Sequence, residues 1–441
     1  MAVKMGQPFW QPLLKEIIPM SVFNKCDILV PHNIDLKKWS VVACDQYTSQ
    51  ADYWEELEKN IQDAPSALKI IYPEIYLSMP DKQKRIEKIH STMNDYLAKG
   101  LFKELKDSFV LVDRTQRDGR VRTGLVGAVD LEEYDFSKGS TSLIRATEGT
   151  VIERIPPRVS IRLDAALEMP HILMLIDDPE ETVIEPMSAK KDEFEKIYDF
   201  DLQMDSGHLT GYIPTKDAQD KAVLAIDALG EKDVFFKKYG VDAPPLQFAV
   251  GDGNHSLATA KTCWETIKET LSEEEKNTHP ARFALVELMN VHDKTLEFEP
   301  IHRVVFDTAP EKMIEAMLDF YPGASFEDNG GQKITYCYSG KEGNIYIKDG
   351  PSKLAVGTLQ IFLDKFVKEN GGEIDYIHGA DVTKTLSEKP GAIGFILPSM
   401  EKSQLFETVI HDGALPRKTF SMGEAHDKKY YMECKRIKMG F

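Results

Sequence analysis

Short apolar runs alternate along this chain with longer stretches in which apolar positions recur every three or four residues. In the first third, "CDILVP" and "WSVVAC" are expected to form strands, as are "FVLVDRT" and "RTGLVGAVDL". The Asp-Gly within "QRDGR", which separates the last two runs, is typical of a β-hairpin. This part of the chain therefore predicts antiparallel strand pairing.

Two helices are expected between these strands. The stretch "TSQADYWEELEKNI" predicts the first, with Thr48 or Ser49 as its N-terminal cap. The stretch "DKQKRIEKIHSTMNDYLAKG" predicts the second, and Gly100 is suited to end it. The N-terminal region is therefore expected to combine helices with antiparallel strands.

The rest of the chain has the same mixed character. Further strands are expected at "HILMLID", "HLTGYIP", "ARFALVELMNV", "FEPIHRVVF" and "GAIGFILP". Further helices are expected at residues 217–229, at "EKMIEAMLDFY" and at "GTLQIFLDKFV". The whole pattern predicts an α+β fold of mixed, largely antiparallel sheets with packed helices, in two to three domains. The expected division is into residues 1–140, 141–307 and 308–441.

The stretch "PPLQFAVGDGNHSLATAKTCWETIK", residues 244–268, is the strongest candidate for a functional site. Its apolar run stops at Asp252, which has Gly251 before it and Gly253 after it. A helical stripe follows, formed by Leu257, Ala260, Trp264, Ile267 and Leu271. The motif is therefore expected to join a strand to the N-terminus of a helix.

Such a junction favours an anion. The first backbone N–H groups of a helix have no helical partner, and the positive end of the helix dipole lies there. Glycines let the backbone turn sharply and let a ligand come close. Asp252 and His255 would then border a phosphate. The open alternative is an ordinary Asp-Gly turn in which Asn254 caps the helix.

Neither standard nucleotide-binding loop is present in this stretch. The GxxxxGK[ST] pattern is absent because Lys261 comes too late in the helix. The GxGxxG pattern fails at its third glycine, where Ser256 stands.

Composition limits the partners that this chain can have. Its 441 residues, 42% of them hydrophobic, are enough for the cores of several domains. The formal net charge of −18 would repel both a phosphate backbone and an anionic membrane surface. We therefore expect a small-molecule or nucleotide ligand and neither nucleic acid nor membrane as a partner. The composition leaves the oligomeric state open.

Cysteine usage and the N-terminal stretch predict a cytoplasmic location. The five cysteines form no CxxC pair, so neither a zinc site nor a disulfide framework is expected, and no haem site is expected. No apolar run reaches 18 residues. Pro8, Pro12 and Glu16 interrupt the stretch where a signal peptide would need an apolar core.

A resemblance adds to this picture. "FAVGDGNHSLATA" is similar to the strand, Asp-Gly-His-His-Arg, helix signature of a widespread bacterial and archaeal family known only as a conserved domain of unknown function. The likeness extends over nearly the whole chain. It also covers "IRATEGT", "FEPIHRVVF" and "ALPRKTF", which carry over Arg145, Glu148, Thr150, His302, Arg303, Pro416 and Lys418.

A more distant resemblance suggests a chemistry. Asp-Gly-x-x-Arg turns between a strand and a helix also mark the ParB and sulfiredoxin-like group, which includes nucleotide-using enzymes and a kinase for free serine. In those proteins the turn lies at the nucleotide phosphates. The resemblance implies a nucleotide here, with Mg²⁺ as the expected ion and its ligands unknown. The chain departs from both patterns, because Asn254 replaces the first family His and Ser256 replaces the Arg.

Other charged residues are candidates to complete such a site. Arg154, Arg158 and Arg162 lie close together in "RIPPRVSIR" and could replace the missing Arg, or could form a surface cluster paired with acids. Acids such as Asp45 and Asp52 could hold Mg²⁺ or accept a proton, although most acids in so acidic a chain are simply solvated.

Three functions are compatible with these observations. The first is an enzyme of small-molecule metabolism that transfers a phosphoryl group to or from a hydroxyl metabolite such as serine. The second is a non-catalytic anion- or nucleotide-binding protein, and the third is a structural interaction module. For the enzyme, the candidate catalytic residues are Asp252, His255 and Glu148. The candidate ligand-binding residues are Gly251, Gly253, Asn254, Ser256, Arg145, Arg154, Arg158, His302, Arg303 and Lys418.

Overall fold

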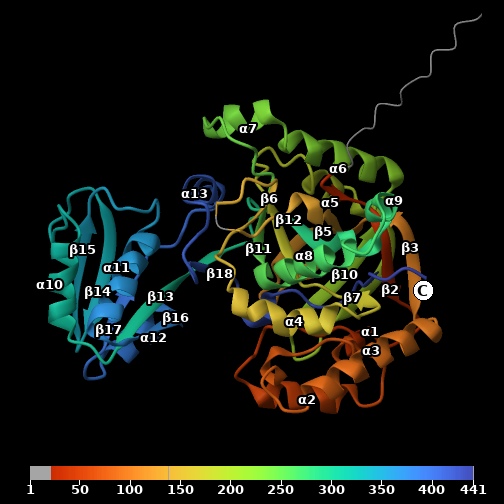
Figure 1. The fold of residues 1–441 in the computed structure, drawn as a ribbon, viewed down its shortest axis with the longest axis horizontal. Helices are drawn as coiled ribbons and strands as arrows, with labels where there is room; N and C mark the ends of the chain where they lie inside the picture. Colours follow the sequence, from red (N-terminus) through yellow and green to blue (C-terminus); the bar gives the residue numbers. More distant parts are fainter. Residues whose placement is uncertain (1–20, 138, 441) are drawn as a thin grey trace, which may run out of the picture.

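The computed structural model describes residues 21–137 and 139–440, which form two lobes of unequal size (Figure 1). The N-terminal stretch that argues against a signal peptide lies outside these residues. Within them, no helix is long and apolar enough to cross a membrane.

A nine-stranded sheet forms the centre of the larger lobe. Its strands, in spatial order, are β6 (Ile144–Ala146), β11 (Phe248–Asp252), β8 (Leu173–Ile176), β12 (Phe283–Asn290), β5 (Val121–Asp130), β4 (Val110–Thr115), β10 (His208–Ile213) and β9 (Glu195–Asp201), and β1 (Phe23–Asn24) pairs with β5. Strands β4 and β5 form the predicted hairpin. Among the described strands of this sheet, only the pairs β6–β11 and β8–β12 are parallel.

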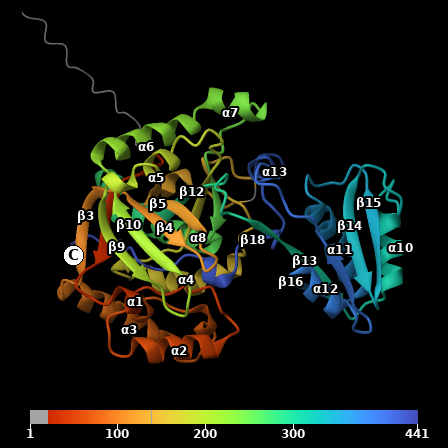
Figure 2. The same ribbon diagram turned by 180° about the vertical axis from the view of Figure 1, so that it is seen from behind.

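Helices cover the larger lobe in two groups (Figures 1 and 2). The first group comprises α4 (Ile155–Arg162), α5 (Glu185–Ser188), α6 (Lys216–Leu229), α7 (Lys232–Tyr239), α8 (Asn254–Lys268) and α9 (Glu273–Thr278). The second group is an outer layer of α1 (Leu36–Trp39), α2 (Ala51–Ile61) and α3 (Lys82–Ala98). In Figure 1, α4 lies between α8 and this outer layer, and α4 packs against α8. Buried Trp54 of α2 and Met93 of α3 join the core of the larger lobe.

Two local predictions in the outer layer are wrong. Residues 39–44 do not form a strand, because Trp39 ends α1 and Val42 makes only an isolated bridge to Tyr430. Residues 39–43 are buried, so the run is apolar because it is packed in the core and not because it forms a strand. The N-cap of α2 is Gln50, without a side-chain cap, instead of Thr48 or Ser49.

The smaller lobe is built on a six-stranded antiparallel sheet. Its strands are β15 (Lys341–Ile347), β14 (Gln332–Tyr338), β17 (Ile393–Ile396), β13 (Phe298–Phe306) and β16 (Glu373–His378), and β18 (Phe420–Met422) pairs with the start of β13. Its helices are α10 (Pro310–Phe320), α11 (Ala355–Asn370) and α12 (Ala380–Ser387), with α13 (Gln404–Asp412) near the junction of the lobes (Figure 1). The predicted mixed fold with largely antiparallel sheets is confirmed.

Strand β13 runs between the two lobes (Figure 1). The Phe298 ring at its start packs at a tilt against the Phe420 ring of β18, with ring centroids 4.3 Å apart. The apolar cluster of the smaller lobe continues from there to Leu175 and Ala249 of the large sheet, so the lobes share packed apolar side chains. The division of the chain at residues 140 and 307 stays a prediction.

Residues 425–437, called the closing segment below, lie inside the larger lobe. Short antiparallel pairings join this segment to β2 (Cys26–Pro31) and to β7 (Leu167–Glu168), and β2 also pairs with β3 (Phe102–Ser108). The Lys429 ammonium group lies 2.6 Å from the buried carboxylate of Glu287 on β12. The closing segment therefore completes the core of this lobe.

Candidate functional site

A one-residue turn at Gly253 joins β11 to α8, as the sequence predicts for this motif. Gly253 has a φ of 79°, a left-handed conformation that favours glycine, and a Cβ there would lie 3.0 Å from Cα of Ile172. A Cβ at Gly251 would lie 2.8 Å from Cδ1 of Leu175. Gly253 thus suits the backbone conformation of the turn, and Gly251 leaves room for the Leu175 side chain.

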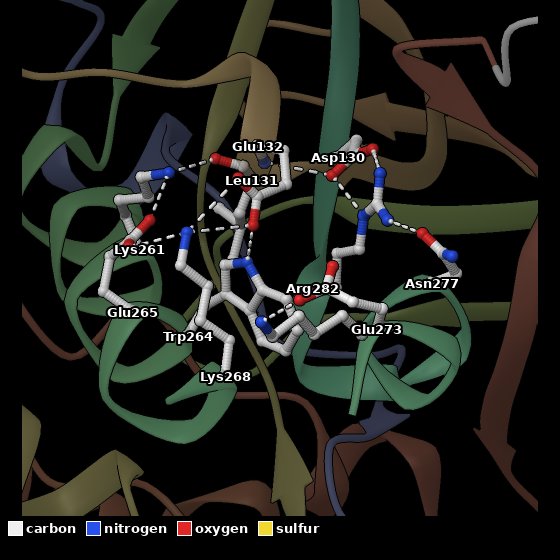
Figure 3. Close-up of polar contacts among 11 residues, drawn as sticks. Asp130, Leu131, Glu132, Lys261, Trp264, Glu265, Lys268, Glu273, Asn277 and Arg282 are labelled. Atoms are coloured by element: carbon white, nitrogen blue, oxygen red, sulfur yellow. Dashed lines mark hydrogen bonds and ion pairs between the residues drawn. The ribbon is translucent and has the colours of Figure 1, made fainter. Parts of the chain in front are cut away.

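The far end of α8 is fixed to the chain that follows β5 (Figure 3). The Trp264 indole N–H donates to the Glu132 carboxylate at 2.5 Å, and the Lys268 ammonium lies 3.1 Å from the same oxygen. Next to them, Arg282 forms an ion pair with Asp130 at 2.6 Å. These contacts hold the direction of α8 and therefore the position of its N-terminus.

Asp252 ends β11 with its carboxylate between the turn and the closing segment. One oxygen accepts a hydrogen bond from the Gly253 N–H at 3.0 Å, and the other lies 3.1 Å from the Lys428 ammonium. A quarter of the Asp252 side chain is exposed, so solvent reaches the pair. No side chain caps the N-terminus of α8.

Asn254 binds the segment that follows β6 to this turn. Its side-chain oxygen accepts a hydrogen bond from the Thr147 N–H at 3.3 Å, and the Thr147 hydroxyl donates to the Val250 carbonyl at 2.6 Å. On its other side, the Thr147 carbonyl accepts from the Leu415 N–H at 2.7 Å. Three separate parts of the sequence therefore meet at the turn.

Glu148 follows Thr147 directly and faces the same turn. Burial raises the pKa of the Glu148 carboxyl, and the charge of Asp252 raises it further, while Lys418 acts in the opposite direction. Lys418 itself is exposed and has a φ of 57°. Two carboxyl groups and two lysines thus lie close enough to influence one another.

His255 is held as a hydrogen-bond acceptor. Its Nε2 accepts from the Val151 N–H at 3.3 Å. Burial, together with the nearby charges of Arg158 and Arg154, lowers its pKa to about 4, so the imidazole is neutral at pH 7. Arg158 forms an ion pair with Glu74 from the outer layer, with Nε 3.0 Å from the carboxylate, whereas Arg154 is exposed.

Three of the sequence candidates make their hydrogen bonds away from the turn. Arg145 donates to the Ser142 and Pro244 carbonyls, before the start of β11. His302 accepts from the Leu397 N–H at 3.2 Å, between strands of the smaller lobe. Arg303 is fully buried and donates to the Arg417 carbonyl at 3.0 Å, although its charge and that of Glu148 still interact.

The sequence did not single out Lys428 or His171, and it named Asp45 only among the many acids. His171 Nε2 lies 3.1 Å from the Asp45 carboxylate, and Nδ1 lies 2.7 Å from the Tyr431 hydroxyl. Burial disfavours the charged imidazole, but Asp45 outweighs this and raises the pKa of His171 well above its usual value. No local pattern marks these residues, because their partners are distant in the sequence.

A comparison with protein families gives a match over most of the chain. The family described as "Protein of unknown function (DUF1015)" matches residues 30–403. The chain belongs to this family. No curated protein matches it. Lys418 and Lys428 both lie beyond the residues matched to the family, and the motif-by-motif resemblance stays a prediction.

Several solved structures resemble this DUF1015 member at low identity. A C-terminally truncated SbnI from Staphylococcus aureus has a TM-score of 0.35 at 10% identity and covers 68% of this chain and 83% of its own. Free serine kinase in complex with AMP has a TM-score of 0.36 at 11% identity, covering 72% and 92%. A conserved hypothetical protein from Pyrococcus furiosus has 0.33 at 12% identity, covering 68% and 96%. At such TM-scores these similarities carry no functional conclusion.

Proposed function

We propose that this chain is a nucleotide- or phospho-ligand-dependent enzyme that transfers a phosphoryl group to or from a hydroxyl-bearing metabolite such as serine. The observation that carries the proposal is the cluster of Glu148, Asp252, Lys418 and Lys428 beside the uncapped N-terminus of α8. Preorganised cations, a helix N-terminus and a proton acceptor are the groups that phosphoryl transfer requires.

The phosphate groups would bind over the first turn of α8. Its first N–H groups point out of the helix end, and Gly253 presents no side chain that would block a phosphate. Two exposed cations lie nearby: the charge of Lys418 acts on Glu148, and the charge of Arg154 acts on His255. The resemblance of this turn to the Asp-Gly-x-x-Arg turns of nucleotide-using enzymes also supports a nucleotide as the ligand.

Glu148 is the proposed proton acceptor. Its raised pKa makes it a stronger base than an exposed carboxylate. In the transfer step, the substrate hydroxyl oxygen bonds to phosphorus, the bond from phosphorus to the leaving oxygen breaks, and the hydroxyl proton passes to Glu148. His255 would act as a positioning residue, because it is neutral and holds the Val151 N–H in the loop after Glu148.

The residues at this site could bind Mg²⁺ only together with the phosphate groups of a ligand. In the described part of the chain, no group of three or more His, Cys, Asp or Glu side chains could hold a metal ion. Mg²⁺ in phosphoryl-transfer sites is usually held by one or two carboxylates, water and the phosphates, and Asp252 could supply one carboxylate. When bound, the ion would neutralise negative charge on the phosphate oxygens.

One observation favours a second candidate, a non-catalytic anion- or nucleotide-binding protein. Asp252 already has a partner in Lys428, which neutralises the carboxylate without an ion or a reacting proton. If this ion pair persists when a ligand is bound, the turn can bind a phosphate without catalysing phosphoryl transfer.

The test combines ligand binding with turnover. The chain is incubated with ATP, ADP or pyrophosphate, with and without Mg²⁺, in the presence of serine and other hydroxyl metabolites. Thermal unfolding reports binding and ³¹P NMR reports transfer. We expect stabilisation by at least one phosphorylated compound and formation of a phosphate ester.

Three variants make the test specific. Lys418→Ala should weaken the stabilisation by phosphorylated ligands, whereas Lys333→Ala, at an exposed lysine of β14, should not change it. Glu148→Gln should keep binding but lose most of the transfer rate. Binding without turnover would favour the second candidate, and the absence of any stabilisation by phosphorylated compounds would contradict both.

A further inference from the structure

A cavity of about 150 Å³ lies between the outer helical layer and the pair α4 and α8. Ile70, Ile71, Leu77 and Met93 line it on one side, and Ile161, Ala165 and Leu167 line it on the other. Most of its wall is apolar. A protein cavity of roughly this volume with an apolar lining can hold a molecule the size of benzene.

One end of this cavity is polar and adjoins the candidate site. Ser256 and Thr259, one turn apart on α8, line it together with His171 and Tyr431. The Thr259 hydroxyl donates to the His255 carbonyl at 2.7 Å, and Ser256 Oγ has only a long contact of 3.4 Å to His171 Nε2. The Ser256 hydroxyl is therefore the group best able to bind a polar atom of a ligand.

The charges around the cavity are already paired. Arg158 faces Glu74 and Arg162 faces Glu168, and each of these four side chains is at most one-fifth exposed. His171 faces Asp45 at the polar end. A ligand with a net charge would have to break one of these pairs, which is costly once the groups are buried. The cavity therefore favours a neutral ligand group.

We propose that this cavity binds a small neutral alcohol with a compact apolar body, of branched-aliphatic or phenyl size, whose hydroxyl is bound at Ser256. The phosphate-binding and proton-accepting roles proposed above do not use this cavity, although Ser256 lies on the first turn of α8. As the acceptor of the phosphoryl group, such an alcohol would be larger and less polar than serine. That assignment as acceptor rests on the proposed function, whereas binding in the cavity does not.

Saturation-transfer NMR on the full chain tests binding, with benzyl alcohol and 3-methylbutan-1-ol as probes and glycerol as the polar control. The two apolar alcohols should bind, and glycerol should give no signal at the same concentration. Equal signals from all three compounds, or none from the apolar alcohols, would overturn the proposal.

Two matched variants locate the binding. Ile161→Trp places a larger side chain in the cavity wall and should weaken the binding of benzyl alcohol at least tenfold. Ile361→Trp changes an exposed residue on α11 of the smaller lobe and should leave binding unchanged. Ser256→Ala should weaken the binding of benzyl alcohol several-fold more than that of toluene, which has no hydroxyl group. Equal effects of the two tryptophan variants would overturn the location.

A readout on the unaltered chain guards against a misfolded variant. Cys44 lines the cavity and is half-buried, so mass spectrometry can follow its alkylation by N-ethylmaleimide. Benzyl alcohol should slow this reaction and glycerol should not, and unchanged alkylation would contradict the proposal. Thermal stabilisation by ATP is measured in parallel. Alcohol binding without any nucleotide binding would contradict the proposed function but not the cavity site. Nucleotide binding without alcohol binding would contradict only the cavity site.

Discussion

The ion pair between Asp252 and Lys428 should stabilise the fold by an amount that can be worked out from its geometry. The charges lie 3.1 Å apart, a separation at which two unit charges attract by about 5 kcal/mol at an effective dielectric constant near 20. Lost hydration offsets most of this attraction. Exposed pairs contribute roughly 0.2–1 kcal/mol, and breaking a buried pair costs roughly 3–5 kcal/mol. With side chains 25% and 11% exposed, this pair should fall between these limits, at about 2 kcal/mol of coupling.

A double-mutant cycle measures this coupling. The free energy of unfolding is obtained from urea denaturation at pH 7 for the parent chain, Asp252→Asn, Lys428→Met and the double variant. Asp252→Asn should be the more damaging single change, because the Lys428 side chain, only 11% exposed, loses its partner while keeping its charge. The double variant should recover about 2 kcal/mol relative to the sum of the single effects.

An exposed pair on α6 provides the control. Lys221 and Asp217 lie 2.7 Å apart, but their side chains are 70% and 74% exposed. The same cycle there should give about 0.3–0.5 kcal/mol. A coupling below about 0.5 kcal/mol at Asp252 and Lys428, equal to that of the control, would refute the argument from burial.

Three further predictions concern the surroundings of the turn. His171→Gln should destabilise the chain most below about pH 6.5, where His171 is charged in both states, and the loss should shrink as pH rises through the raised pKa of the folded state; a loss in unfolding free energy that stays constant from pH 5 to 9 would contradict this. Leu257→Ala, at a fully buried position of α8, should cost about 3 kcal/mol in urea denaturation, and a cost under about 1 kcal/mol would show that the site collapses around the change. Asn254→Ala leaves the Thr147 N–H without its acceptor and should cost about 1–2 kcal/mol by the same measurement, whereas an unchanged midpoint would mean that water replaces the amide.

The elements that the sequence predicted well are those set by local chemistry. The hairpin of β4 and β5 follows from Asp118 and Gly119 between two β-rich runs, and the turn at Gly253 follows from its two glycines. Residues 39–44 were misassigned because burial alone makes a run apolar. Their backbone partners, such as the Lys429 carbonyl that accepts from the Ala43 N–H, come from the closing segment far along the chain.

The candidate site was predictable only where its residues share one motif. The sequence proposed Asp252, Asn254 and His255 from their place between a predicted strand and a predicted helix and from a family resemblance, and the turn brings them together. It could not foresee that Lys428 pairs with Asp252 or that Asp45 raises the pKa of His171, because each contact joins distant segments. The neutral state of His255 likewise depends on burial and on Arg158, which only the tertiary structure provides.

The interior position of the closing segment affects how this protein is made. The Trp39 indole N–H donates to the Met432 carbonyl across 393 residues of sequence. At 5–20 residues per second, a ribosome needs roughly 20–80 s between these two residues, and the core of the larger lobe lacks its last buried side chains throughout. Lys428 and Tyr431 are synthesised only at the end of this interval. A nascent chain therefore carries the Asp252 turn long before it carries a site, and a chain stopped short of residue 425 would expose the apolar surface that the closing segment covers.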